Sequence, residues 1–273
     1  MNKFALQLYS VRDALSRENF ASRMKELAEM GYEGVEPAGL YDLTASEMKA
    51  ACDAAGLKIV SMHIPMTEML EKPDFYAEYL TTVGCPQAVI PHIQKKCLPG
   101  GEDWPAFREQ IAFLIEKFTP YGIALAYHNH DFEFDIMPDG RYALDFMYDT
   151  FPADKLKTQL DTAWVNVAGI DPAEFIKKYS GRCPTVHLKD FAGSKDGGCP
   201  YALIGVDGSA PTDSGSFEFR PCGYGVQDFP AIIDSALDAQ AGWFIVEQDQ
   251  PSMGKSSLEC AQMSIQYLKG LGK

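Results

Sequence analysis

The sequence predicts one (β/α)8 barrel domain that spans residues 1–273. Its 273 residues are close to the roughly 250 that such a barrel needs. Short β-rich apolar runs alternate eight times with longer segments of helical period, and this alternation predicts parallel strands. A doubly wound open sheet would need a glycine-rich turn after its first strand, and the residues after that strand, Ser10-Val-Arg-Asp13, contain no glycine.

The eight strands are predicted from short runs rich in apolar and β-branched residues. They cover residues 4–9, 34–36, 57–62, 88–90, 123–127, 158–160, 185–188 and 243–246.

The helices are predicted from apolar spacing and from start and stop signals. Phe20, Met24 and Leu27 share one helical face, and Gly31 stands where a helix C-terminus is expected. Thr44-Ala-Ser-Glu47 and Ser256-Ser-Leu-Glu259 are capping boxes that open two helices. The predicted helices cover residues 19–30, 44–56, 74–83, 103–121, 144–150, 172–179 and 226–239, and the last begins at Ser256.

Residues 191–224 form one long irregular stretch rich in Gly, Pro, Ser and Asp. A structureless loop of this length inside a compact domain is usually a lid or a binding loop. A disordered insertion is the alternative.

Composition excludes several classes of protein. A net charge of −14 argues against a nucleic-acid partner, because phosphate binding needs a basic surface. No apolar run reaches the roughly 18–20 residues of a membrane span, and no secretory signal opens the chain. Seven scattered cysteines without a C-x-x-C spacing favour free thiols. A cytoplasmic protein is therefore expected.

Polar residues gather where the predicted strands end, and chemistry in barrels of this type lies at the carboxyl ends of the strands. Four of the five histidines lie at such ends. His128, Asp161, His187 and Glu247 follow neighbouring strands and are predicted to bind one divalent metal ion. A mixture of imidazole and carboxylate suits Mn²⁺, Fe²⁺ or Zn²⁺ better than Mg²⁺, with Co²⁺ also suitable.

Each of these residues also has a structural interpretation. Asp161 could cap a helix, His187 could be a core histidine bonded to a carbonyl, and Glu247 could pair with an arginine. The four together are better explained by a site than by three unrelated structural roles.

At these strand ends the chain resembles the xylose-isomerase-like barrels, which include sugar phosphate isomerases/epimerases, inosose dehydratases and tagatose-type 3-epimerases. The matching segments are Leu6-Gln-Leu-Tyr-Ser-Val-Arg12, Gly34-Val-Glu36, Tyr127-His-Asn-His130, Leu160-Asp161, His187-Leu-Lys-Asp190, Gly223-Tyr-Gly-Val-Gln-Asp228 and Val246-Glu-Gln-Asp249. The resemblance implies a metal held by Glu, Asp, His and Glu, of which the last three correspond to Asp161, His187 and Glu247.

The first ligand departs from the epimerase pattern, because His128-Asn-His130 stands where those members have Glu-Asn-His. A shift of the strand would turn Tyr127 or His130 inward instead, and Glu133 could supply a nearby carboxylate. With only Glu247 secure, epimerisation between two glutamates is less favoured than isomerisation, elimination or dehydration, each of which needs one base.

The resulting hypothesis is a metal-dependent isomerase or epimerase that removes a proton next to the carbonyl of a sugar or cyclitol. Glu247 is the expected base, and His130 or Lys189 the expected proton donor. Glu36, His63 and Glu133 are expected to bind the substrate. Lys189 as a Schiff-base lysine is a weaker alternative, because four metal-type ligands make a carbonyl-polarising amine redundant.

Other functions are a dehydratase or lyase on a keto-sugar or inosose, a metal-dependent endonuclease for abasic DNA, and a non-catalytic sugar-binding barrel. The endonuclease would need more ligands and a basic face. The expected partner is a small carbohydrate, with no nucleic acid and no membrane, and a homo-oligomer is one option. No phosphate-binding G-x-x-x-x-G-K-[ST] loop is present, so the sequence leaves phosphorylation of the substrate open.

Overall fold

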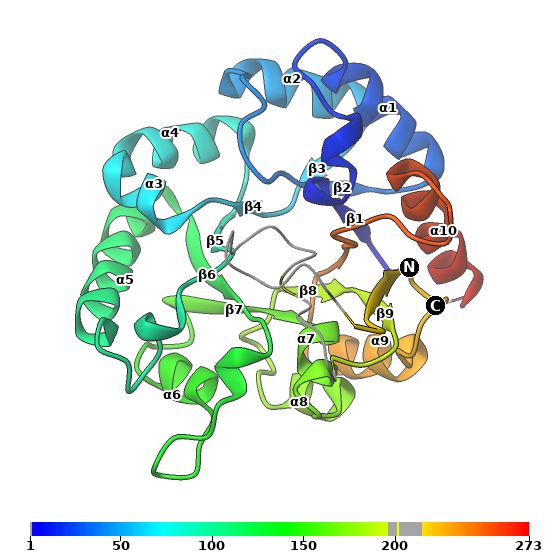
Figure 1. Ribbon diagram of the computed structural model, residues 1–273. Coiled ribbons are helices and arrows are strands. Elements are labelled where there is room, and N and C mark those ends of the chain that lie inside the picture. Colours follow the sequence, from blue (N-terminus) through cyan, green and yellow to red (C-terminus); the bar gives the residue numbers. More distant parts are fainter. Residues whose placement is uncertain (1, 196–200, 202–214, 273) are drawn as a thin grey trace.

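The computed structural model describes residues 2–195, 201 and 215–272 of the chain. Figure 1 shows a central barrel of strands surrounded by a ring of helices. The sheet runs in the order β3-β2-β1-β11-β8-β7-β6-β5-β4, and its paired strands are parallel. Its strands are β1 Phe4–Gln7, β2 Gly34–Glu36, β3 Lys58–Ile59, β4 Met62–His63, β5 Gln87–Ile90, β6 Ala124–His128, β7 Leu156–Asp161, β8 Thr185–Leu188 and β11 Trp243–Val246.

Strands β3 and β4 are two halves of one barrel strand. Only Val60 and Ser61 separate them in the chain, and they pair with β2 and β5 respectively. A parallel bridge from Ala38 to His63 joins the region after β2 to β4, so the sheet closes through the two halves. The described strands therefore make an eight-stranded barrel, which confirms the predicted fold class.

The helices cover the outside of the barrel (Figure 1). They are α1 Phe20–Met30, α2 Ala45–Ala55, α3 Met66–Glu71, α4 Pro73–Val83, α5 Trp104–Phe118, α6 Ala143–Asp149, α7 Thr162–Val167, α8 Pro172–Lys177, α9 Phe229–Asp238 and α10 Ser257–Gly270. Both predicted capping boxes are present, at Thr44 and at Ser256. Among the described residues, no helix is long and apolar enough to span a membrane.

The layer between the barrel strands and the surrounding helices is apolar, whereas the interior of the barrel is partly polar. Met24 and Leu27 of α1 are fully buried against the sheet, as are Ile111 and Leu114 of α5. Inside the barrel, polar side chains are buried too: Gln7, Glu36, Gln87, Gln159 and Thr185. Buried polar groups are costly unless they are hydrogen-bonded, so these side chains must bond to one another.

Several details differ from the sequence prediction. The strand predicted over 4–9 ends at Gln7, and a 3-10 helix, Leu8–Ala14, follows it. The strand predicted over 57–62 is interrupted at Val60 and Ser61, and the helix predicted from Val226 begins at Phe229, because the Asp228 side chain accepts from the Ala231 N–H and caps it there. The short helices α3 and α7 were not predicted. Length explains the last two, since six residues are too few for a clear helical period.

The region predicted as irregular, 191–224, carries strand structure at both ends. Strands β9 Asp190–Ala192 and β10 Glu218–Arg220 pair antiparallel. The prediction of continuous irregular structure is therefore wrong there. Residues 196–200 and 202–214, on which most of the predicted lid falls, lie outside the described residues.

Asp190 anchors the chain where it returns from β10 to the barrel. Its carboxylate accepts hydrogen bonds from the backbone N–H groups of Phe191 (2.9 Å), Gly223 (3.0 Å), Gly225 (2.9 Å) and Gln227 (3.1 Å). A Cβ at position 225 would lie 2.2 Å from Asp190 Oδ1, so only glycine fits beside the carboxylate. Gly223 is needed for another reason: its φ is +88°, and a Cβ there would lie 2.4 Å from the Tyr267 ring.

We expect Asp190→Ala to lower the free energy of unfolding by on the order of 3 kcal/mol, because it leaves four backbone N–H groups, those of Phe191 and Gln227 buried, without an acceptor. Asp228→Ala is the control: it removes one N-cap and should cost about 1 kcal/mol. Urea unfolding followed by circular dichroism measures both. Equal losses in the two variants would show that Asp190 is no anchor.

Candidate active site and metal-binding side chains

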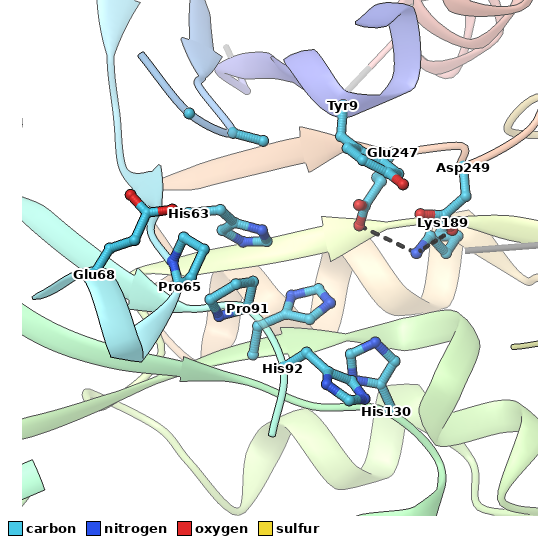
Figure 2. A pocket seen from close by; sticks show the side chains of 13 residues that line it. Tyr9, His63, Pro65, Glu68, Pro91, His92, His130, Lys189, Glu247 and Asp249 are labelled. Carbon is cyan, nitrogen blue, oxygen red and sulfur yellow. Dashed lines mark ion pairs between the residues drawn. The ribbon is translucent and has the colours of Figure 1, made fainter. Parts of the chain in front are cut away.

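A cavity of about 400 Å³ opens at the carboxyl ends of the barrel strands. Figure 2 shows side chains from several strand ends pointing into it. Five of the residues that line it were predicted from the sequence: His63, His128, His130, Lys189 and Glu247. The pocket therefore lies where the strand-end argument expects it.

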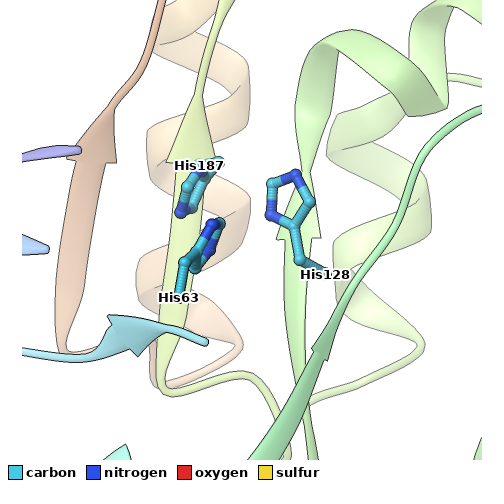
Figure 3. A group of neighbouring side chains, drawn as sticks. All are labelled: His63, His128 and His187. Atoms are coloured by element: carbon cyan, nitrogen blue, oxygen red, sulfur yellow. The ribbon is translucent and has the colours of Figure 1, made fainter. Parts of the chain in front are cut away.

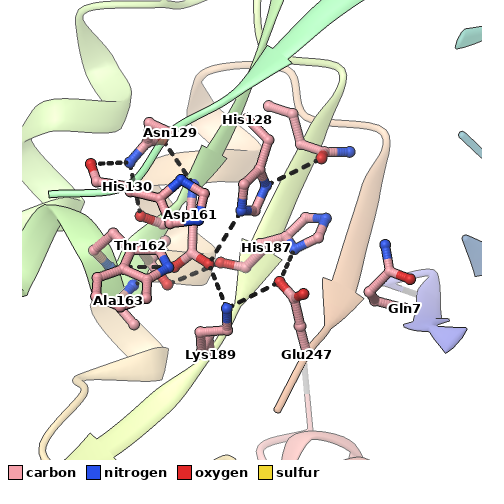
Figure 4. Close-up of polar contacts among 12 residues, drawn as sticks. Gln7, His128, Asn129, His130, Asp161, Thr162, Ala163, His187, Lys189 and Glu247 are labelled. Atoms are coloured by element: carbon pink, nitrogen blue, oxygen red, sulfur yellow. Dashed lines mark hydrogen bonds and ion pairs between the residues drawn. The ribbon is translucent and has the colours of Figure 1, made fainter. Parts of the chain in front are cut away.

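The four predicted metal ligands come together at the base of this pocket. His128, Asp161 and His187 lie at or near the ends of β6, β7 and β8, and Glu247 follows β11 directly. One ligand atom from each lies within 4.8 Å of the others, and all four side chains are buried. Figure 4 shows their side chains converging on one point.

The two carboxylate oxygens of Asp161 have different roles: one caps a helix, and the other faces the proposed metal site. Oδ1 accepts from the backbone N–H groups of Ala163 (2.8 Å) and Trp164 (3.2 Å) and so caps α7. Oδ2 is buried and has no hydrogen-bond partner among the described residues. The Lys189 ammonium lies 3.3 Å from Oδ2 without making a hydrogen bond to it, so a metal ion could still coordinate this buried oxygen.

The charge balance of the site also fits a cation. Lys189 Nζ lies 3.3 Å from Asp161, 3.2 Å from Glu247 and 2.8 Å from Asp249, and its side chain is buried. Although burial lowers it, these carboxylates raise the pKa of Lys189 well above its ordinary value. With Glu36, four buried carboxylates face two cationic groups, Lys189 and His187, and the excess of negative charge favours a further cation.

His187 lies between two carboxylates. Its Nε2 is 2.7 Å from Glu36 Oε1, and its Nδ1 is 2.7 Å from Glu247 Oε2. Burial lowers the pKa of His187, but Glu36 and Glu247 outweigh burial and raise it to about 10. Metal-binding histidines commonly donate their second N–H to a carboxylate, and Glu36 is placed for this role.

Glu36 is fully buried beneath the pocket rather than in its wall. It accepts from Gln7 Nε2 (2.7 Å), Gln159 Nε2 (2.6 Å) and the Ser61 hydroxyl. Burial raises its pKa, but His63 and His187 outweigh burial and lower it to about 2. Glu36 is therefore an ionised carboxylate that only accepts hydrogen bonds.

This carboxylate fixes the orientation of Gln159. Because Glu36 only accepts, the NH₂ of Gln159 must face it, and the Gln159 carbonyl oxygen points to the other side. That oxygen lies 2.7 Å from His63 Nε2 and 3.2 Å from His128 Nδ1, and both nitrogens must donate to it. Figure 3 shows the side chains of His63, His128 and His187 close to one another. The rings of His63 and His187 are stacked, with their centroids 5.4 Å apart.

The network sets which nitrogens of the ligand histidines carry protons. Burial, helped by His187, lowers the pKa of His128 well below its ordinary value, so the ring is neutral. With its proton on Nδ1, His128 presents the lone pair of Nε2, which faces Asp161 Oδ2 at 3.6 Å. Glu36 accepts from His187 Nε2, and Glu247 accepts from His187 Nδ1, so both ring nitrogens of His187 carry protons here. A metal ion would displace the Nδ1 proton, because Glu36 can keep the proton on Nε2.

A second group, His63 with His128 and His187, is also close enough to hold a metal ion. His63 Nε2, however, already donates to Gln159 and lies 3.2 Å from Glu36. The group with Asp161 and Glu247 fits a cation better, because it contains two carboxylates, whereas the other group consists of three imidazoles.

The opposite wall of the pocket carries neutral imidazoles. His130 and His92 have ring centroids 5.0 Å apart, and both line the pocket. Burial lowers the pKa of each to about 4, with Lys189 adding to the effect at His130 and His130 adding to it at His92. His130 Nδ1 is buried without a hydrogen-bond partner among the described residues.

Glu133 lies behind His130 and is fully buried, away from the pocket lining. It accepts from the Tyr127 hydroxyl (2.5 Å) and from the His130 backbone N–H (2.9 Å). Burial raises its pKa to about 7. Its contacts make it a support for the loop that carries His130.

Several pocket residues were missed by the sequence reasoning: Tyr9, Glu68, His92 and Asp249. His92 had a usable signal, since it stands two residues after β5 and makes the fifth histidine a strand-end residue as well. Glu68 had none, because it lies on the unpredicted helix α3.

Known proteins resemble this chain over nearly its whole length. A rhizopine catabolism protein MocC from Rhizobium meliloti is 22% identical, over 90% of this chain and 79% of its own. An inosose dehydratase from Geobacillus thermodenitrificans is 24% identical, over 92% of this chain and 89% of its own.

Solved structures show the same fold. A sugar phosphate isomerase/epimerase from Parabacteroides distasonis superimposes with a TM-score of 0.74 at 22% identity, covering 98% of this chain and 93% of its own. An L-ribulose 3-epimerase gives a TM-score of 0.71 at 14% identity, covering 100% and 94%. The family model of the xylose isomerase-like TIM barrel matches residues 24–271, and the chain belongs to that family.

Proposed function

We propose that this protein is a divalent-metal-dependent enzyme that removes a proton next to the carbonyl of a sugar or cyclitol, in an isomerase- or epimerase-type reaction. The observation that carries the proposal is the convergence of His128, Asp161, His187 and Glu247 at the base of the pocket. The sugar- and cyclitol-acting relatives support the substrate class, among them the inosose dehydratase.

These four residues would hold Mn²⁺, Zn²⁺, Fe²⁺, Co²⁺ or Mg²⁺. When bound, such an ion polarises a carbonyl and stabilises negative charge on its oxygen. The rest of the chemistry belongs to the protein. Lys189 is a buried cation among three carboxylates, so it holds Glu247 and Asp249 in place and can donate a hydrogen bond to a substrate oxygen.

Proton transfer is assigned to Glu247 and Lys189. Glu247 accepts the proton from the carbon next to the carbonyl, since it is the carboxylate that lines the pocket beside the ligand histidine His187. Lys189 is a cation and is the proton donor to an oxygen or a leaving group, whereas the neutral His130 donates only a hydrogen bond to the substrate. His63 lines the same pocket and is placed to contact a hydroxyl.

Dehydration is the second candidate, and the asymmetry of the pocket favours it. One wall carries carboxylates and Lys189, whereas the other carries the imidazoles of His92 and His130. An elimination needs a base and an acid at the leaving hydroxyl, for which Glu247 and the Lys189 ammonium are available, while the neutral imidazoles can hold the substrate by hydrogen bonds. A symmetrical epimerisation would instead need two similar bases.

We expect the metal-loaded protein to exchange the proton next to the carbonyl of a ketose or inosose with deuterium from D₂O. Glu247→Gln should lower the exchange rate by at least about 100-fold, the smaller end of what a general base contributes. Proton NMR in D₂O measures the exchange, and loss of water is followed in the same spectra.

Glu68→Gln is the control, because Glu68 lines the pocket without belonging to the metal-binding group. An unchanged exchange rate in Glu247→Gln would show that Glu247 is not the base that accepts the proton. No exchange with any ketose or inosose would favour a non-catalytic sugar-binding barrel.

A further inference from the structure

A second cavity, of about 610 Å³, adjoins the proposed active site. The two cavities share three lining residues: Pro65, Pro91 and His92. The second cavity lies against α3 and α5, and we call it the side lobe. No proton-transfer residue of the proposed mechanism lines it, so the reaction described above leaves it unused.

The side lobe has an apolar floor and a polar rim. Met66, Ile93 and Phe107 supply buried apolar surface, and Leu70 adds a half-buried side chain. At the rim, Lys96 forms an ion pair with Asp103 (2.9 Å), so its charge is already balanced. A phosphate or carboxylate would find no free cation among the described lining residues. The chemistry therefore suits a neutral, largely apolar group.

Size leads to the same conclusion. The active-site cavity alone, at about 400 Å³, is within the roughly 300–1,000 Å³ of small-molecule sites and is large enough for one sugar ring. A free monosaccharide or cyclitol bound at the metal-binding side chains would leave the side lobe empty. A sugar with an attached group could fill both cavities at once.

We propose that the side lobe is a subsite for an apolar substituent carried by the substrate, so that the protein acts on a glycoside that has a carbonyl on its sugar ring and an apolar aglycone, rather than on a free sugar. Glycosides without that carbonyl can occupy both cavities but cannot react, so they report binding alone. The proposal rests on the proposed function for the position of the sugar ring. His92 marks the junction: its ring packs edge-on against His130 (5.0 Å) and Phe132 (5.6 Å), which fixes it between the two cavities.

The test compares matched ligands and matched variants. The ligands are the methyl and phenyl β-glycosides of D-glucose, D-galactose and D-xylose, titrated calorimetrically into the metal-loaded protein. Ala106→Trp places an indole in the side lobe from the exposed face of α5. Ala112→Trp is the control, since Ala112 is exposed on the same helix and lines neither cavity.

In at least one pair, the phenyl glycoside should bind the unmodified protein at least tenfold more tightly than the methyl glycoside. Ala106→Trp should abolish that advantage without changing the affinity for the methyl glycoside, and Ala112→Trp should preserve it. The proposal is overturned if no phenyl glycoside binds more tightly than its methyl partner, or if the advantage survives in Ala106→Trp.

Deuterium exchange separates this proposal from the proposed function. An unsubstituted inosose or ketose does not need the side lobe, so Ala106→Trp should exchange its proton as fast as the unmodified protein. If the unmodified protein exchanges the proton but binds no phenyl glycoside more tightly than its methyl partner, the subsite proposal is wrong and the proposed reaction stands. If it binds a phenyl glycoside more tightly but exchanges no proton, the proposed reaction is wrong and the subsite stands.

Discussion

Asp161→Asn should lose divalent metal while the fold is retained. The asparagine side-chain oxygen can still accept from Ala163 and Trp164 and cap α7, whereas the anionic Oδ2, which makes no hydrogen bond, is replaced by an amide NH₂. Loss of a side chain that only hydrogen-bonds to a metal ligand typically costs about 10–100-fold in metal affinity, so loss of a ligand itself should cost more. Calorimetric titration with Mn²⁺, Co²⁺ and Zn²⁺, together with elemental analysis, measures the effect.

His187→Ala should show the same loss, and far-UV circular dichroism should remain that of a barrel in both variants. His92→Ala is the matched control, because His92 lines the same pocket but is not one of the four proposed ligands. Full metal occupancy in both Asp161→Asn and His187→Ala would show that these residues do not hold the metal.

Gln159→Leu should weaken metal binding by about 10–100-fold although the side chain is not itself a ligand. The leucine cannot hold the Nδ1 proton of His128, and it leaves Glu36 without one of its donors. His128 then loses its preference for the form in which Nε2 is free. Titration with Co²⁺, followed by absorbance, measures the affinity.

Gln87→Leu separates this effect from a general loss of buried hydrogen bonds. Gln87 is also buried inside the barrel and also bonds to Thr185, but it has no hydrogen bond to a histidine. Long-range ¹H–¹⁵N NMR spectra of the metal-free protein should show His128 protonated at Nδ1 in the unmodified protein and in Gln87→Leu. A mixed protonation state before any substitution would contradict the role given to Gln159.

The fold was predictable because the barrel repeats one pattern many times. Each strand and helix supplies weak evidence, but eight consistent alternations leave few other architectures. The errors fall where local contacts decide the structure. Asp190 organises the return of the chain through four backbone N–H groups that are 1 to 37 positions away in sequence, and no local pattern reveals such an anchor.

The candidate site was predictable for the side chains at the ends of strands. Parallel strands bring their carboxyl ends together, so the position of Asp161 or His187 in the sequence implies its place in space. The direction of a side chain within a strand is less accessible. Glu36 ends β2, as predicted, yet it faces the barrel interior and bonds to Gln7, Ser61 and Gln159 instead of facing the pocket.

Gln159 shows why the supporting network could not be predicted. A glutamine in the middle of a strand has no distinctive spacing, and its importance depends on contacts with β2, β4 and β6, three strands distant in sequence. The side lobe is similar, because it forms between a loop and the helices α3 and α5.

The antiparallel pairing of β9 with β10 has a consequence for how this protein can be engineered and how it can diverge. Ala192 and Glu218 face each other across that pair, so the chain between them leaves and re-enters the fold at one point. Lengthening a segment with fixed ends costs only about 0.6 kcal/mol per doubling. Extra residues inserted after the exposed Ser194 should therefore leave the barrel and its metal-binding side chains in register. Phe217 has to be kept, because it is buried against Trp164.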